Sequence, residues 1–327
     1  MGRRFDPGLR LPMKLTKKNI KTITDRYSLS EVVKITPIEE GWVNYSFNFE
    51  TTKGDFIVQV IGSNYSKGKE KNMKIQFALL DTLRKKGFPY EVPSPLKNKA
   101  GKHILKIGPL YLWVYRRIEG EPVKNINQEQ FKQAAKALAI YHKLIKSFSP
   151  RCDKKSFFDF DRLSAIYETL KIKKPRDKTD SLMLTNLGYF KELWNKLRRI
   201  DFREQLIITH SDFNSSNFIF RKGKLIGIID FDNLQFAPLA KDISLAVERC
   251  DYLGEGYSEK KKRIFVKEYE KYNKLSSRSK NLIIPILLKD NCRLIWWFYE
   301  GMKKNLDKRH SSVVETIRNT KKFAKSL

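Results

Sequence analysis

Along the first third of the chain, apolar and polar residues alternate in short runs, and this period of two predicts β-strands. Val32–Ile38 is rich in β-branched residues, and Tyr45–Thr51 alternates phenylalanine with polar residues. The dipeptide Lys53-Gly54 is typical of a tight turn, and the apolar run Phe56–Ile61 follows it. Three consecutive strands are therefore expected, the second and third joined as a hairpin.

The pattern then changes to one helix and one further hairpin. Apolar residues recur at the spacing of a single helical face before Gly87, a residue type that commonly ends helices (Ile75, Leu79, Leu80 and Leu83). Alternation returns over 103–107 and 110–118, which predicts two more antiparallel strands. Residues 20–119 are therefore predicted to form a small antiparallel sheet with one helix, and residues 1–19 a basic tail.

After a break at Glu119–Pro122 the chain is mainly helical. A long helix is expected over Gln128–Ser147. Further on, two helices are expected within 151–205, on either side of a charged loop near 173–180, and three more over 240–250, 260–271 and 279–305. Three short apolar runs interrupt these helices and predict strands over 206–209, 218–220 and 225–229. Residues 120–327 are therefore predicted to form a larger helical lobe, which makes the fold class α+β with two lobes.

Charge adds a second feature, because the 327 residues carry a formal net charge of +30. Such a charge suits nucleic acid or an anionic membrane, but no arginine-rich, aromatic-interleaved recognition module is present. We expect nonspecific polyanion binding at most, and no specific nucleic-acid function. Apolar runs such as Leu282–Leu288 are too short to span a bilayer. The three cysteines are widely spaced, and a cytoplasmic location is expected.

The candidate chemistry lies where the three short strands meet polar residues. The loop after the first of them contains His210, Asp212 and Asn217, and the third strand leads directly to Asp230. An aspartate can accept the proton of an attacking hydroxyl, whereas an amide oxygen and a second carboxylate suit Mg²⁺. These groups are the minimum needed to move a phosphoryl group from ATP to an alcohol. Asp, Asn and Ser also favour ordinary turns, but the two halves occur in order after a β-rich lobe.

The same residues resemble a known family. The motif His210–Asn217, the motif Ile229–Asp232 and the segment Asp242–Ala246 are similar to those of the aminoglycoside-phosphotransferase and choline-kinase superfamily, whose fold is protein-kinase-like. The stretches Gly41–Asn44 and Phe77–Pro95 look closest to its homoserine-kinase-like branch. The resemblance implies ATP as co-substrate and Mg²⁺ as cofactor, with Asp212 as base and Asn217 and Asp230 as metal ligands. It gives His210 and Asp242 structural roles. Asp232 either approaches a second Mg²⁺ or orders the loop.

In the first lobe the resemblance implies a nucleotide site with an unusual feature. Backbone groups near Gly41 and Asn44 would approach the phosphates, and those of Arg116 and Ile118 would meet the adenine. Gln59 occupies the position where the family places a phosphate-binding lysine. An amide can still donate a hydrogen bond to a phosphate, and the alternative is that a nearby lysine supplies the charge (Lys67, Lys69 or Lys71).

Substrate identity is less well determined. Only residues 231–241 separate Asp230 from Asp242, too few for the activation segment of a protein kinase, so a small-molecule hydroxyl is expected. An aromatic group with a carboxylate either cages a cationic substrate or packs in the lobe (Trp296, Trp297, Tyr299 and Glu300). Amino alcohols, amino acids, sugars and aminoglycosides stay open as substrates. The alternative function is a pseudokinase or basic binding module. It is suggested by Gln59, by the single glycine Gly41 where a kinase would have a glycine-rich loop, and by the net charge of +30.

Overall fold

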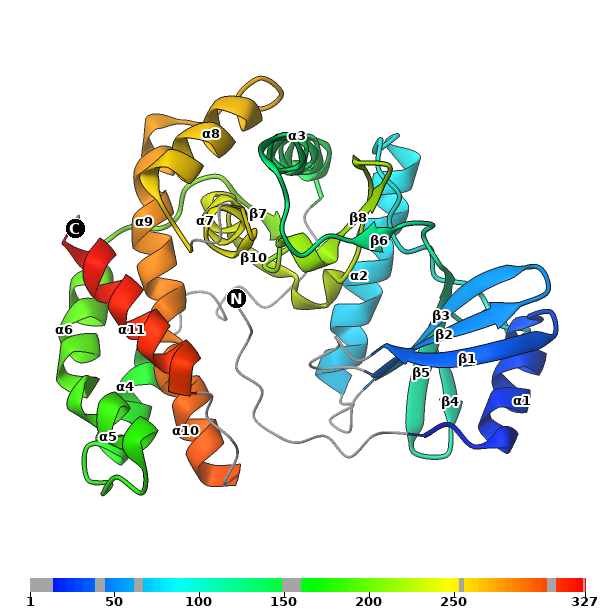
Figure 1. The fold of residues 1–327 in the computed structure, drawn as a ribbon, viewed down its shortest axis with the longest axis horizontal. Coiled ribbons are helices and arrows are strands. Elements are labelled where there is room, and N and C mark those ends of the chain that lie inside the picture. The colour runs from blue at the N-terminus through cyan, green and yellow to red at the C-terminus, as the bar shows by residue number, and fades with distance from the viewer. Residues whose placement is uncertain are drawn as a thin grey trace.

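The structure is a computed structural model in which residues 14–38, 45–61, 67–148, 160–252, 256–304, 310–325 and 327 are described. It has a β-rich lobe, labelled β1 to β5 in Figure 1, and a larger lobe that is mainly helical. The predicted α+β fold class is therefore confirmed. Among the described residues, no helix is both long enough and apolar enough to cross a membrane.

The sheet of the first lobe is antiparallel, with the strand order β1-β2-β3-β5-β4. Its members are β1 (Val32–Ile38), β2 (Tyr45–Thr51), β3 (Gly54–Ile61), β4 (Leu105–Ile107) and β5 (Leu110–Arg116). The turn between β2 and β3 requires Gly54, whose φ of +115° is strained for other residues. The strands predicted from alternation are all present, and β3 and β5 bury side chains on both faces because an apolar cluster lies on each side of the sheet.

One helix covers each face of this sheet (Figure 1). The helix α2 (Lys67–Lys85) packs through Met73 and Phe77 against one face. The helix α1 (Lys17–Tyr27) packs through Ile23 and Tyr27 against the other. Helix α1 is a second helix beyond the one predicted, and it begins inside the segment 1–19 that was expected to be a tail. Few of its residues are apolar, although Ile20, Ile23 and Tyr27 have the spacing of one helical face.

The second lobe begins with β6 (Glu121–Pro122) and α3 (Gln128–Ile145), whose N-terminus carries a capping box formed by Asn127 and Gln130. Three helices follow where two were predicted: α4 (Phe160–Leu170), α5 (Lys178–Thr185) and α6 (Leu187–Leu197). Asn186 alone separates α5 from α6. The sequence pattern predicts a single helix here and does not show this boundary, although Gly188 lies two residues beyond Asn186.

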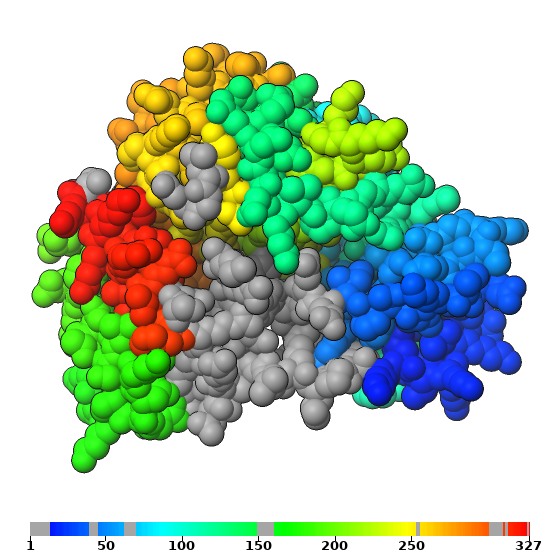
Figure 2. Space-filling view, viewed as in Figure 1, coloured from blue at the N-terminus to red at the C-terminus, as the bar shows by residue number. Residues whose placement is uncertain are grey.

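The C-terminal helices are α7 (Ala240–Arg249), α8 (Glu259–Tyr269), α9 (Ser277–Cys292), α10 (Leu294–Lys304) and α11 (His310–Ala324). The single helix expected over 279–305 is therefore wrong, because the chain breaks at Arg293. The helix α11 was not predicted. Figure 2 shows its red side chains beside the green ones of α5 and α6, and the hydroxyl of Tyr189 donates to the carbonyl of Thr320 at 3.5 Å.

Short strands at the centre of the second lobe carry the candidate site. These are β7 (Leu206–Thr209), β8 (Phe218–Arg221), β9 (Lys224–Ile228) and β10 (Gln235–Pro238). The strands β8 and β9 form a hairpin that β6 extends, whereas β7 pairs with β10. The strands predicted at 206–209, 218–220 and 225–229 are confirmed. The strands β6 and β10 were missed because each has too few residues to show alternation.

Candidate active site

The loop between β7 and β8 places Asp212 and Asn217 in direct contact. The side-chain nitrogen of Asn217 donates to the carbonyl oxygen of Asp212 at 2.8 Å and to its Oδ2 at 3.3 Å. Asn214 Nδ2 donates to the same carbonyl and to Oδ1, both at 2.9 Å. Asp212 is only 1% exposed, so these amides replace water as its hydrogen-bond donors. Because Asn217 uses its nitrogen for Asp212, its oxygen is directed elsewhere.

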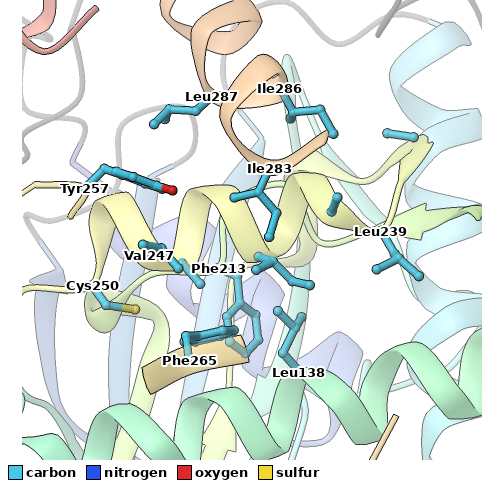
Figure 3. Close-up of a cluster of buried hydrophobic side chains, with 14 of the residues drawn as sticks. Leu138, Phe213, Leu239, Val247, Cys250, Tyr257, Phe265, Ile283, Ile286 and Leu287 are labelled. Atoms are coloured by element: carbon cyan, nitrogen blue, oxygen red, sulfur yellow. The ribbon is translucent and has the colours of Figure 1, made fainter. Parts of the chain in front are cut away.

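Apolar packing anchors the same loop in the core of the second lobe. Phe213, the residue after Asp212, is buried in a cluster with Leu138 of α3, Val247 of α7 and Phe265 of α8 (Figure 3). Burying a phenylalanine side chain stabilises a fold by roughly 2 to 3 kcal/mol. Asp212 is therefore bonded to a residue that cannot move without disrupting this core.

The carboxylate of Asp242, in the first turn of α7, fixes the backbone of the loop. It accepts from the backbone N–H groups of His210 at 2.8 Å and Ser211 at 2.7 Å. It also contacts His142 Nε2 of α3 at 3.1 Å. Burial opposes ionisation of Asp242, but these donors and the two histidines outweigh burial and lower its pKa. Ser211 has a positive φ of 61°, and the two backbone hydrogen bonds hold this unusual conformation.

The contacts of His142 extend this network to α8, and the sequence pattern did not show it. His142 Nδ1 lies 2.8 Å from the hydroxyl of Tyr269, which accepts from Asn273 Nδ2 at 2.9 Å. Asn273, Tyr269 and His142 therefore form a buried hydrogen-bonded chain that ends at Asp242. His142 lies with Leu138 and Ala139 on the buried face of α3, and a histidine at such a position in the sequence is the signal that could have revealed it.

A backbone hydrogen bond brings the third strand to the loop. The N–H of Ile229 donates to the carbonyl of Asn217 at 2.9 Å, so Asp230 follows directly after a residue tied to the loop. His210 Nε2 contacts the carbonyl of Ile229 at 3.1 Å, and its ring lies 4.5 Å from that of Phe231. His210 thus joins the two segments by packing and hydrogen bonding. Asp230 has φ 62° and ψ 61°, a left-handed conformation that ends the strand abruptly.

These residues fit a magnesium ion by their chemistry. Within the described ranges, no group of three or more His, Cys, Asp and Glu side chains could hold a metal ion. A cation here would therefore be held by the amide oxygen of Asn217 and the carboxylate of Asp230, together with phosphate oxygens and water. Mg²⁺ often binds in this way, through one or two protein oxygens and the phosphates of its nucleotide.

Asp232 faces the first lobe. Its Oδ2 accepts from Gln59 Nε2 of β3 at 3.2 Å, and its Oδ1 accepts from Gln76 Nε2 of α2 at 2.8 Å. Burial raises the pKa of Tyr115 of β5, and the carboxylates of Asp232 and Asp230 raise it further. The structure therefore places Gln59 beside the turn that follows Asp230. Gln76 was missed, since a glutamine on an amphipathic helix carries no distinctive signal.

The other predicted nucleotide residues are less well placed by the structure. Gly41 and Asn44 lie outside the described residues. The Arg116 side chain is directed to the hairpin at Gly54, where an added Cβ would lie 3.0 Å from its guanidinium. Ile118 is buried beside Gly227 of β9, which must be glycine because a Cβ there would lie 2.9 Å from Ile118. The segment 116–118 thus connects the sheet closely to the strand that carries Asp230.

Charged side chains of both signs lie near Asp212. Arg249 Nη1 lies 3.7 Å from Asp212 Oδ1, and Arg249 Nη2 donates to Asp290 Oδ2 at 2.7 Å. Arg293 Nη1 donates to Asp290 Oδ1 at 3.2 Å. Burial opposes the ionisation of Asp290, but Arg293, Arg249 and Lys241 together hold its pKa below the usual range. Burial raises the pKa of the neighbouring Glu248 to about 7, against the effect of Arg249.

The proposed aromatic cage lies on α10, which packs on α4 and α9. The rings of Trp296 and Trp297 meet edge to face at 4.5 Å, and the guanidinium of Arg162 lies 5.1 Å from the centre of Trp296. Ile295 and Phe298 are buried, as expected for the packing alternative.

A basic groove of about 790 Å³ runs along α8 and the start of α9. Seven cationic residues and two glutamates line it: Lys260, Lys262, Arg263, Lys267, Lys271, Lys274, Lys280, Glu259 and Glu270. No residue of the loop between β7 and β8 is among those that line this groove. Part of the net charge is therefore gathered outside the candidate active site.

A sheet lobe joined to a helical lobe, with Asp212, Asn217 and Asp230 on neighbouring turns, defines a phosphotransferase of the kinase-like class. Residues 34–274 match the family model APH, described as the phosphotransferase enzyme family. The chain belongs to this family. The resemblance to the aminoglycoside-phosphotransferase superfamily is thereby confirmed.

Three known proteins illustrate this relationship. The homoserine kinase of Bartonella tribocorum is 25% identical over 217 residues, which cover 65% of this chain and 63% of that kinase. This chain therefore spans less than two thirds of the length of that relative. An amicoumacin kinase in complex with AMP-PNP, Ca²⁺ and Ami has a TM-score of 0.69 at 18% identity, covering 95% and 93% of the two chains. A microcompartment-associated aminopropanol kinase has a TM-score of 0.66 at 13% identity, covering 93% and 95%. Both structures support the fold.

Proposed function

We propose that the protein is an ATP-dependent kinase that transfers the γ-phosphoryl group to a hydroxyl of a small molecule. The observation that carries this proposal is the contact between Asn217 and Asp212 in a loop whose backbone also holds the segment of Asp230. A base and two metal-binding oxygens are thus gathered where a strand ends in a tight turn. Phosphoryl transfer needs mainly positioning and charge stabilisation, and this arrangement can supply both.

Each residue has a defined role in this proposal. Asp212 orients the substrate hydroxyl and accepts its proton, while the two amides on its carboxylate keep it in place. Asn217 and Asp230 hold Mg²⁺, which when bound neutralises the phosphate oxygens. The nucleotide would bind to the first lobe, residues 20–119, with the backbone of Gly41 and Asn44 at the phosphates and segment 116–118 at the adenine. Residues 120–327 would supply the catalytic groups and the substrate site, and residues 1–19 would form a tail.

The charges beside Asp212 favour one substrate class among those left open. Arg249 and Arg293 could bind a carboxylate, and Glu248 and Asp290 could bind an ammonium group. A hydroxylated amino acid carries both groups, which agrees with the homoserine kinase among the relatives. A polycationic aminoglycoside would need uncompensated acids instead. A choline-like amino alcohol is the second candidate, favoured by the aromatic residues of α10, which already hold one guanidinium.

Buried free thiols at Cys250 and Cys292 support a reducing, cytoplasmic location.

The test is Mg²⁺-dependent consumption of ATP with a panel of hydroxylated amino acids, amino alcohols, sugars and aminoglycosides. Asp212→Asn should lower kcat by at least about 100-fold while Mg-ATP affinity is retained, because the variant lacks the base but keeps the metal ligands. Asp230→Ala should lose Mg-ATP binding, measured by titration calorimetry. Equal turnover by wild type and Asp212→Asn would refute the assigned base. A wild-type protein that neither binds Mg-ATP nor turns over any substrate would instead be the pseudokinase or binding module.

A further inference from the structure

The carboxylate of Asp232 lies between the two lobes, although it belongs to the turn of Asp230. Phe231–Asn233 form one short 3-10 turn, η2, which follows Asp230. Phe231 is buried, and the carboxylates of Asp230 and Asp232 both act on Tyr115 of the sheet. Asp232 is therefore carried by the same short turn that follows Asp230.

Two glutamines from separate elements of the first lobe bind this carboxylate. Gln76 of α2 is only 4% exposed and donates to Oδ1 at 2.8 Å, while Gln59 of β3 donates to Oδ2 at 3.2 Å. The residues that make these bonds are 156 and 173 positions away from Asp232 in the chain. These two hydrogen bonds form a clamp on Asp232, and the clamp exists only when the sheet, α2 and η2 are assembled.

The chemistry of the clamp is complementary in one protonation state. An ionised carboxylate only accepts hydrogen bonds, and a primary amide donates through its nitrogen. Each oxygen of Asp232 is matched by one such donor, so the clamp is satisfied when Asp232 is ionised. A lysine at position 59 would add a full charge, whereas Gln59 and Gln76 hold the carboxylate with two neutral groups. Each amide occupies one acceptor site on its oxygen, so both oxygens of Asp232 are held by protein donors from the first lobe.

We propose that Asp232 is a latch between the lobes and not a second metal ligand, and that Gln59 and Gln76 are the positioning residues that hold it. By fixing η2 from the side of the first lobe, the clamp sets the direction of Asp230 relative to the sheet on which the nucleotide would lie. The inference rests on the proposed function for its kinetic part. The physical contact between the lobes does not depend on that function.

Replacement of Asp232 separates a latch from a ligand. An asparagine side chain at this position would keep two hydrogen bonds, because either glutamine can turn its amide and accept from the new Nδ2. In Asp232→Asn, the apparent KM for Mg²⁺ should therefore stay within about threefold of the wild type, whereas removing an oriented metal ligand or its support costs about 10- to 100-fold. Asp232→Leu, which can make neither bond, should raise the KM for both Mg²⁺ and ATP by about tenfold. A rise of tenfold or more in the Mg²⁺ KM of Asp232→Asn would overturn the latch.

The glutamines are tested by near-isosteric changes, which guard against loss of folding. Gln76→Met and Gln59→Met should each raise the KM for Mg-ATP by about three- to tenfold, with kcat less affected, since they loosen the position of Asp230 and leave the base intact. Asn72→Ala is the matched control, because Asn72 is an exposed amide one turn away on α2. If Gln76→Met behaves like Asn72→Ala, the positioning role is refuted.

A readout without turnover keeps this inference separate from the proposed function. In thermal unfolding, Gln76→Met and Asp232→Leu each remove the same bond, so the double variant should show a Tm no lower than that of the poorer single variant. Additive shifts in Tm would show that the two residues do not interact, and would overturn the latch even in an active enzyme. Coupled shifts in a protein that never binds Mg-ATP would leave the latch standing while the kinase proposal fails.

Discussion

Two aspartates hold the halves of the candidate site, and they do so in different ways. Asp242 is fully buried inside the second lobe, where backbone N–H groups and His142 surround it. Asp232 is partly exposed at the junction between the lobes, where two side-chain amides bind it. The first is built into one folding unit, whereas the second forms only when two units meet. We infer that the proposed base Asp212 is preorganised, whereas the position of a bound nucleotide would depend on how the lobes are joined.

The largest expected effect is the loss of the buried carboxylate. Asp242→Asn should lower the free energy of unfolding by about 3 kcal/mol, because an amide nitrogen would face backbone N–H donors in a site without water. Loosening of the loop should also reduce kcat by at least about tenfold. Urea unfolding and steady-state kinetics measure the two effects. Asp232→Asn is the comparison, and it should cost less than about 1 kcal/mol because its partners can turn. Equal losses of unfolding free energy in the two variants would contradict the proposed difference between Asp242 and Asp232.

The charged cluster beside Asp212 predicts a stability that depends on pH. With the pKa of Glu248 raised to about 7, the folded protein keeps a proton between roughly pH 4.5 and 7 that the unfolded chain has released. Stability should therefore fall as pH rises through this window, by up to about 3 kcal/mol. Glu248→Gln should raise Tm at pH 8 and leave it unchanged near pH 4.5. A constant difference in Tm at all pH values would show that Glu248 does not titrate there.

Lys241 provides the matched control for this pH dependence. It is fully buried, and burial lowers its pKa to about 7, so the unfolded chain binds the extra proton above that pH. Its contribution should make stability rise between roughly pH 7 and 10.5, in the opposite direction to that of Glu248. Lys241→Met should therefore flatten the alkaline side of the stability profile and leave the acidic side unchanged.

A smaller effect is expected at the outer end of the buried network. Tyr269→Phe removes the hydroxyl that binds His142 Nδ1, and should lower the free energy of unfolding by about 1 kcal/mol. Because Asp242 keeps its three donors, kcat should change less than in Asp242→Asn. Urea unfolding at neutral pH is the measurement, and Tyr272→Phe, a half-buried tyrosine nearby, is the control. A larger loss of kcat than in Asp242→Asn would place the centre of the network at Tyr269.

The smallest effect concerns the basic groove on α8. We expect only weak, nonspecific polyanion binding there, which should weaken steeply as salt is raised. Lys267→Glu combined with Lys271→Glu should lower the affinity for heparin or single-stranded RNA several-fold and leave ATP turnover unchanged. A salt-resistant preference for one RNA sequence would contradict the expectation that the charge has no specific nucleic-acid function.

Several elements show why the sequence pattern succeeded in some places and failed in others. The helix α3 has strong periodicity because it buries one face against a large core, whereas β2 and β3 were found from their aromatic and β-branched residues and the turn between them. The helix α1 is poor in apolar residues, and its packing on the sheet was not visible in the sequence. The boundary at Arg293 carries no glycine or proline, while Pro285 lies within a continuous helix, so the usual markers pointed to the wrong place.

The sequence by itself determined the local part of the site. Asp212, Asn217 and Asp230 lie within one strand–loop–hairpin unit, so short-range geometry brings their segments together, and residue type and spacing were enough to propose them as a group. Only the tertiary structure decided which distant side chains support them. His142 meets Asp242 from 100 positions away, Arg249 meets Asp290 from 41, and Gln59 meets Asp232 from 173. Such contacts depend on how helices and sheet pack, and a single polar residue on a helix or strand does not reveal which partner packing will bring to it.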